Sequence, residues 1–244
     1  SDVDVQFNMT GGNINVDVQA TNNSASSTAA FSIGASTTVN WSGGVVTIID
    51  PRATAGGGSF ANATATNKII TGGKLRIGDG VSVTTGGTLS NTSGFGLSGV
   101  VWDLEIDNLT NISTSRMART TGTVTVLNNV EIKANGYYFL GSGTTGSTLV
   151  VTGNMINNGT LAGCEPGGTQ VIGTLYFRGL GAQSLTGAGL FTAYATLNFY
   201  NLGTTFNISD FEYSEENELW NQQVELNGEV RDMRPIYIIR GEKP

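Results

Sequence analysis

Apolar and small polar residues alternate along most of this chain, in short runs that end at Gly, Asn or Thr. The segment VVTGNMINNGTLAG, residues 150–163, alternates and then breaks at Asn157-Asn158-Gly159. An alternation with a period of two places successive side chains on opposite faces of a β-strand. The pattern therefore predicts many short strands joined by turns, and it contains no convincing helical period between Gly11 and Ser209.

Three of these runs recur at a regular spacing. VTVLNNVEI, LVVTGNMIN and TLYFRGLGA begin at residues 124, 149 and 174, so each starts 25 residues after the one before it. Repeats of this length are typical of stacked architectures, in which each unit buries its apolar face against its neighbours.

A longer internal similarity, called here the 93-residue echo, relates residues 94–113 to residues 189–209 at an offset of 93 residues. It sets Leu104 over Leu197 and Ile106 over Phe199, so the positions expected to face inward agree in type. The outward positions do not agree.

These patterns predict an all-β fold, a right-handed parallel β-solenoid with stacked coils of about 25 residues. Val, Leu, Ile and Phe fill its lumen, Thr and Asn form hydrogen-bonded ladders between coils, and Gly supplies positive φ at corners such as Gly159. An antiparallel β-sandwich or jelly roll is the alternative. The side chains predicted to face inward are Leu149, Val151, Leu175, Phe177, Leu197 and Phe199.

Changes in pattern divide the chain into three parts. Residues 1–50 fit the 25-residue spacing poorly and are expected to form a cap or a separate small sheet. Residues 51–209 are assigned to the solenoid repeats. Residues 210–244 form a charged segment that holds 9 of the 19 acidic and 4 of the 12 basic residues of the chain.

The charged C-terminal segment has two interpretations. It is either a polar cap that closes the open end of the solenoid or a docking element that holds the rod to a larger assembly. The segment VELNGEV is predicted to form a hairpin around Asn227-Gly228. Trp220, Tyr237 and Ile239 are the candidate partner-docking anchors.

Composition and charge exclude several classes of partner. The formal net charge of −7 and the sparse Lys and Arg argue against nucleic acid binding. No run of about 18 apolar residues is present, which argues against membrane insertion. Cys164 is the single cysteine, so the chain has no intrachain disulfide.

The absence of His removes Ser-His-Asp catalysis and most zinc sites. Asp103, Glu105 and Asp107 alternate along DLEID and are expected on one outward face, with Leu104 and Ile106 inward. We interpret the three carboxylates as a solvated strand face, with a Ca²⁺ site or a catalytic acidic cluster as the alternatives. We expect no cofactor and no enzymatic activity. Asp79 in IGDGVS is interpreted as a turn residue.

The repeats STLVVTGNMINNGTLAG, GTLYFRGLGAQSLTGAGLF and ATLNFYNL resemble those of parallel β-helix proteins. Such repeats occur in large secreted bacterial adhesins, and similar rods occur in phage tail and fibre proteins. The resemblance covers residues 94–209. It implies a rod that presents its outer surface to partners.

We expect a non-enzymatic structural or binding rod, a phage virion component such as a tail, fibre or capsid-decorating protein on the virion exterior. The sequence shows no export signal, which favours this reading over a secreted adhesin on the bacterial cell surface. A polysaccharide-degrading β-helix enzyme is the second alternative. The expected partners are other structural subunits of a larger assembly, with a homotrimer as one arrangement, and a cell-surface glycan.

Overall fold

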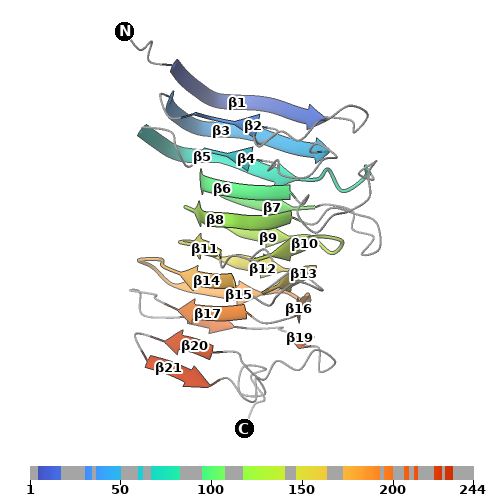
Figure 1. Ribbon diagram of the computed structural model, residues 1–244, viewed down its shortest axis with the longest axis vertical. Coiled ribbons are helices and arrows are strands. Elements are labelled where there is room, and N and C mark those ends of the chain that lie inside the picture. Colours follow the sequence, from blue (N-terminus) through green and yellow to red (C-terminus); the bar gives the residue numbers. More distant parts are fainter. Residues whose placement is uncertain are drawn as a thin grey trace.

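The structure is a computed structural model of the 244-residue chain. It describes residues 5–17, 31–34, 37–50, 60–62, 67–82, 95–107, 118–140, 147–163, 173–192, 195–199, 206–208, 212–213, 223–226 and 229–232. The strands lie across the long axis and stack along it from the N-terminus to the C-terminus (Figure 1).

The first sheet has eight strands. In spatial order they are β1 (Val5–Asp17), β3 (Thr37–Asp50), β5 (Asn67–Ile77), β7 (Asp103–Ile106), β9 (Val130–Ile132), β12 (Met155–Asn157), β15 (Gln183–Thr186) and β18 (Phe206–Ile208). Every pairing in this sheet is parallel, so the chain makes a circuit of the molecule between one strand and the next.

The second sheet has thirteen strands and branches at β8. Its N-terminal part contains β2 (Phe31–Ser32), β4 (Phe60–Ala61), β6 (Phe95–Val101) and β8 (Ala118–Val126). One branch continues through β10 (Tyr137–Phe139), β13 (Thr160–Ala162), β16 (Leu190–Thr192) and β19 (Glu212–Tyr213). The other continues through β11 (Thr148–Val151), β14 (Gly173–Phe177), β17 (Ala195–Phe199), β20 (Gln223–Leu226) and β21 (Glu229–Asp232).

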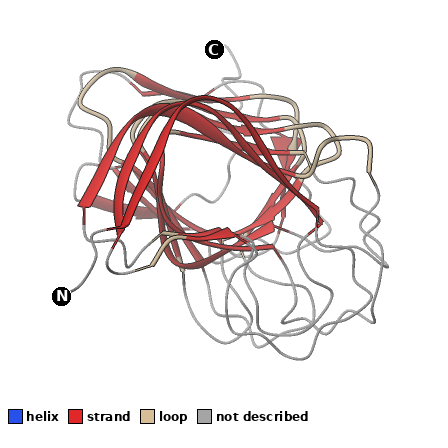
Figure 2. Ribbon diagram, turned by 90° about the horizontal axis from the view of Figure 1, so that it is seen from above, coloured by secondary structure: helices blue, strands red, loops and turns tan. Residues whose placement is uncertain are grey.

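These parallel sheets confirm the predicted β-solenoid and exclude the antiparallel sandwich. Viewed along the long axis, the strands surround a common interior (Figure 2). The coils lie about 29 residues apart, which is more than the 25 expected. The 25-residue spacing holds locally, where Val124 pairs with Leu149. The spacing is longer in the N-terminal coils, where Val46 pairs with Leu75.

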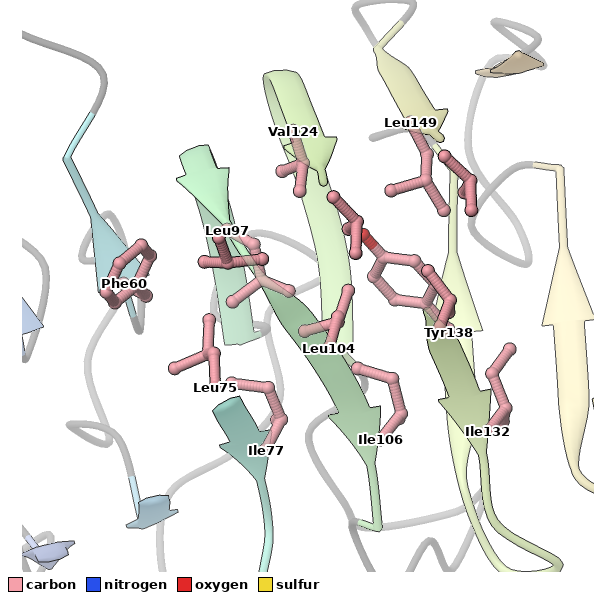
Figure 3. Close-up of a cluster of buried hydrophobic side chains, with 14 of the residues drawn as sticks. Phe60, Leu75, Ile77, Leu97, Leu104, Ile106, Val124, Ile132, Tyr138 and Leu149 are labelled. Atoms are coloured by element: carbon pink, nitrogen blue, oxygen red, sulfur yellow. The ribbon is translucent and has the colours of Figure 1, made fainter. Parts of the chain in front are cut away.

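The lumen is filled by apolar side chains stacked from coil to coil (Figure 3). One column of the first sheet consists of Val46, Leu75, Leu104, Val130, Met155 and Leu185, which are in register and buried. The facing column of the second sheet includes Val124, Leu149 and Leu175. Tyr138 of β10, in the second sheet, is fully buried, with its hydroxyl 2.8 Å from Thr120 Oγ1.

The predicted inward positions are confirmed where side chains are described. Leu149, Val151, Leu175 and Phe177 are all buried. The backbones of Leu197 and Phe199 pair in register with Leu175 and Phe177, but their side chains lie outside the described residues.

Two details of the predicted repeat are wrong. The 25-residue spacing sets Thr174 beneath Leu149, whereas Leu149 pairs with Leu175, because this coil is one residue longer. The 93-residue echo does not relate equivalent positions either. Leu104 belongs to β7 in the first sheet and Leu197 to β17 in the second, since alternation alone does not specify the sheet.

The corner at Gly159 also differs from the prediction, because its φ does not lie in the positive region. A Cβ built on Gly159 would lie 2.3 Å from the carbonyl oxygens of Lys133 and Gly136 in the preceding coil. Glycine is therefore required here because two coils approach closely, and not because the backbone adopts a positive φ.

The expected boundary at residue 50 does not interrupt the first sheet, because β3 pairs directly with β5 and β1 pairs with β3. At the other end, β20 stacks on β17 in parallel and then pairs with β21 in an antiparallel hairpin, as predicted for VELNGEV. Part of the charged C-terminal segment thus continues the stack. Cys164, Trp220, Tyr237 and Ile239 lie outside the described residues.

Candidate functional site

The acidic segment DLEID forms β7 and the residue that follows it. Leu104 and Ile106 face the lumen and are buried, as predicted. The period of two therefore places Asp103, Glu105 and Asp107 on the outer face of the first sheet.

Two cations of the preceding coil lie against these carboxylates. In the strand register, Lys74 of β5 pairs with Asp103 and Arg76 pairs with Glu105. Lys74 Nζ donates a hydrogen bond of 2.6 Å to Glu105 Oε2, and Arg76 Nη2 donates to Asp107 Oδ2. Arg76 Nε lies 2.7 Å from Glu105 Oε1 as an ion pair, although the N–H is not directed along a hydrogen bond. Two adjacent coils are thus joined by charge.

Glu105 is the most deeply placed of the three carboxylates, with 8% of its side chain exposed. Burial alone would raise the pKa of Glu105. The hydrogen bond from Lys74 and the charges of Lys74, Arg76 and Lys133 oppose that effect and hold the pKa below its ordinary value. The expectation of a solvated strand face is therefore wrong for Glu105, because the neighbouring coil covers it.

A turn after β5 packs closely against Asp107. Gly80 N donates to the carbonyl oxygen of Asp107 at 2.9 Å, and a Cβ on Gly80 would lie 2.6 Å from Asp107 Oδ2. Asp79 accepts hydrogen bonds from the backbone N–H groups of Val81 and Ser82 and from the Ser82 hydroxyl. Asp79 is therefore the turn residue that the sequence predicts.

The following coil adds a further ion pair on the same face. Lys133 Nζ donates to Glu131 Oε1 at 2.5 Å, and this hydrogen bond raises the pKa of Lys133. Glu131 pairs in register with Glu105, so two like charges face each other on adjacent strands. Each is neutralised by its own cation, which limits the repulsion between them.

Asp103 has a different role, because it begins a ladder of side-chain oxygens at the N-terminal ends of the stacked strands. Asp103 Oδ1 accepts from Asn129 N at 3.0 Å, Asn129 Oδ1 from Asn154 N at 2.9 Å, and Asn154 Oδ1 from Ser184 N at 2.9 Å. Each side-chain oxygen thereby satisfies a backbone N–H of the next coil. This is the coil-to-coil Asn ladder predicted from the composition.

A pocket of about 270 Å³ lies on this outer face. Its lining includes the strand residues Glu105, Glu131 and Ile156 together with Asp103, Asn129 and Asn154. Lys74 of β5 also lines the pocket. The pocket combines carboxylate, amide, ammonium and apolar groups.

The arrangement joins coils more readily than it binds a metal. Ca²⁺ takes six to eight oxygen ligands, whereas the oxygens of Glu105, Asp107 and Glu131 already contact cations of the protein. In the described part of the chain, no three His, Cys, Asp or Glu residues are grouped to hold a metal ion.

Sequence reasoning missed the two cations of β5. The signal was present, because KLR at 74–76 and DLE at 103–105 carry opposite charges at the same alternate positions, 29 residues apart. The 25-residue spacing derived from the C-terminal repeats did not bring the two segments together.

Comparison with known proteins gives no relative on which a function could rest. No protein-family model, curated protein or solved structure matches the chain. Among the residues that the structure describes, no helix is long and apolar enough to cross a membrane.

Proposed function

We propose that this chain is a non-enzymatic structural rod, a component of a larger assembly exposed on the exterior of a phage virion. The observation that carries the proposal is the network of Lys74, Arg76, Glu105 and Asp107. The acidic side chains with the greatest potential for chemistry are engaged with the neighbouring coil. Their contacts stabilise the stack rather than leave a free acid and base.

The ladders support the same proposal. Asp103, Asn129 and Asn154 bind one coil to the next through their side-chain oxygens. Together with the parallel backbone pairing, they connect every coil of this region along the long axis. A fold held in this way suits an extended, protease-resistant part on the outside of a particle. Its partners are other structural subunits, and a homotrimer and a surface glycan belong to the same proposal.

A bacterial surface adhesin has the same structural requirements as a virion rod. The location of the protein, on the virion or on the bacterial cell surface, therefore distinguishes the two proposals. Mass spectrometry of purified particles and of the secreted supernatant from the producing culture is the test. We expect the chain in the particle fraction, at a constant ratio to the other virion proteins. Its presence in the supernatant or cell envelope alone would replace the virion proposal with the adhesin.

A polysaccharide-degrading enzyme is the second candidate, and the pocket beside Glu131 is the observation that favours it. Viscometry of acidic polysaccharides with the purified chain tests this alternative. We expect no shortening of the polymer. Shortening that is lost in Glu131→Gln, with the fold retained, would make the rod proposal wrong.

A further inference from the structure

The strand β1, at the N-terminal edge of the first sheet, has the features of a strand in the interior of a sheet. Among the described residues, β1 pairs with β3 alone, and it lies at the end of the stack (Figure 1). The strand is 13 residues long and carries no charged residue and no Pro between Val5 and Val16. Natural edge strands are usually short, charged or interrupted, because a free edge can pair with another chain.

The lumen is incompletely covered at this edge. Phe7, Ile14 and Val16 of β1 are only partly buried, although they pack against the core. Their register partners in the next coil, Val39, Val46 and Ile48, are fully buried. One more strand over β1 would give this layer the same cover.

A glycine pair recurs at one place in the first three coils. Thr10-Gly11-Gly12, Ser42-Gly43-Gly44 and Thr71-Gly72-Gly73 lie at the same register shift, and the second glycine of each has a positive φ. Because the bulge is shared by three stacked strands, it is not a device that protects the edge.

In the second and third coils, close contact with the preceding coil requires the first glycine of the pair. A Cβ on Gly43 would lie 2.5 Å from the carbonyl oxygen of Thr10, and one on Gly72 would lie 2.3 Å from that of Ser42. Real Cβ atoms do not approach a carbonyl oxygen so closely. The carbonyl oxygens of Thr10 and Ser42 therefore require glycine at positions 43 and 72 of the next coil.

Gly11 is the equivalent glycine of β1, and no contact among the described residues requires glycine there. A Cβ on Gly11 would meet no atom within 4 Å, and its φ is not in the positive region. Glycine in a strand interior weakens the strand unless another backbone approaches closely. The residue fits a carbonyl oxygen placed above β1, as Thr10 lies above Gly43.

We propose that β1 receives a parallel strand from a different polypeptide, which carries the same Thr/Ser-Gly-Gly bulge and alternating apolar residues. The added strand would pair with the free backbone edge of β1 and cover Phe7, Ile14 and Val16. This mode is strand addition, in which main-chain hydrogen bonds supply affinity and alternate side chains supply specificity. The inference rests on the proposed role as an assembly subunit and assigns one attachment surface, at the N-terminal end of the stack.

A second copy of this chain fits the edge less well. Stacking the C-terminal end of another copy on β1 would offer β18, which has 3 residues and no glycine pair. Two copies related by a two-fold axis would pair β1 with β1 in antiparallel fashion. That pairing would not reproduce the parallel carbonyl-over-glycine contact of the first three coils.

The test uses a fluorescent peptide with the sequence VQFNMTGGNINVD as the added strand. We expect saturable binding to the full chain by anisotropy, at least tenfold weaker binding to Gly11→Val, and unchanged binding to Gly181→Val. Gly181 is the matched control, because a Cβ there also meets nothing within 4 Å. A peptide in which both glycines are replaced by Val should not bind.

Stability measurements separate docking from folding. Gly11→Val should keep the melting temperature of the wild type, whereas Gly43→Val should lower it, because its side chain would contact Thr10. Equal peptide binding by Gly11→Val and wild type would overturn the proposal. Absence of peptide binding to the wild type would do the same.

Two further outcomes would overturn the assigned occupant. Hydrogen exchange that already shows the outward β1 amides protected in the free monomer would place the occupant within this chain. A dimer in analytical ultracentrifugation that Gly11→Val abolishes would make it a second copy. Peptide binding does not depend on the location of the protein, so its failure is distinguishable from a failure of the virion proposal.

Discussion

Arg76 on β5 and Glu105 on β7 lie opposite each other on adjacent parallel strands, and Arg76 Nε is 2.7 Å from Glu105 Oε1. The same carboxylate accepts a hydrogen bond from Lys74, and the same guanidinium donates to Asp107. This relationship links two coils separated by 29 residues of sequence. The acidic residues Glu105 and Asp107, which could be taken for ligand-binding groups, therefore hold adjacent coils together.

The pairing of Glu105 predicts a specific pH dependence. Its folded-state pKa is depressed, while the unfolded value is about 4.3. The stabilisation is therefore fully present above the unfolded pKa and is lost as the pH falls through the lower folded pKa. Glu105→Gln should be less stable than wild type in urea at pH 7, and the difference should shrink as the pH falls below the unfolded pKa of about 4.3 and through the lower folded pKa. A difference that stays constant as the pH is lowered would show that the charge is not responsible.

The inward register predicts a large effect of truncation at Leu175, which is fully buried. Leu175→Ala should lower the free energy of unfolding by about 2 to 5 kcal/mol, because it leaves a cavity between stacked coils. Thr174→Ala is the control on the outer face and should change it by less than about 1 kcal/mol. Urea denaturation measures both. Similar effects at the two positions would contradict the register.

The engagement of the carboxylates by protein cations predicts that chelation has no effect. The melting temperature in EDTA should equal that in buffer, and added Ca²⁺ should not raise it. A ligand that binds the native state alone stabilises it by mass action, so a bound ion would be visible in this measurement. A fall in EDTA that Ca²⁺ reverses would restore the calcium alternative for Asp103, Glu105 and Asp107.

The C-terminal segment is expected to dock the rod as well as to close it. Deleting residues 233–244 removes the anchors Tyr237 and Ile239 but keeps the β20–β21 hairpin. We expect a folded rod, with unchanged circular dichroism, that no longer copurifies with its particle. Deleting residues 211–244 also removes β20 and should lower the melting temperature, because it exposes the edge of β17.

Two results would contradict this account of the segment. Normal assembly of the shorter truncation would confine attachment to other surfaces, such as the β1 edge. Unfolding or aggregation of the shorter truncation would make the last residues a cap rather than a docking element.

The alternation of apolar residues was sufficient to predict the fold and the direction of the core side chains. Leu149 and Val151 were placed inward because a strand has a period of two and the lumen accepts only one of its faces. Asp79 was placed in a turn for a local reason as well, since its side chain binds the backbone two and three residues later. Local chemistry of this kind is readable in a sequence.

The exact pairing of residues between coils could not be predicted from a single repeat spacing. The coil length varies with strand and corner length, so a spacing taken from Val124 and Leu149 misplaces Leu175 by one residue. The same variation concealed the pairing of Arg76 with Glu105. The close contact that requires Gly159 depends likewise on the coil above it.

The central claim is that the acidic segment joins coils, and a double-mutant cycle between Arg76 and Glu105 tests it most directly. The free energy of unfolding is measured in urea for wild type, Arg76→Gln, Glu105→Gln and the double variant. Because 8% of the Glu105 side chain and 30% of the Arg76 side chain are exposed, we predict a coupling energy of about 1 to 2 kcal/mol. Additive effects of the two substitutions would show that the residues do not interact. The claim that the ion pairs on the outer face of β5 and β7 hold adjacent coils together would then be wrong.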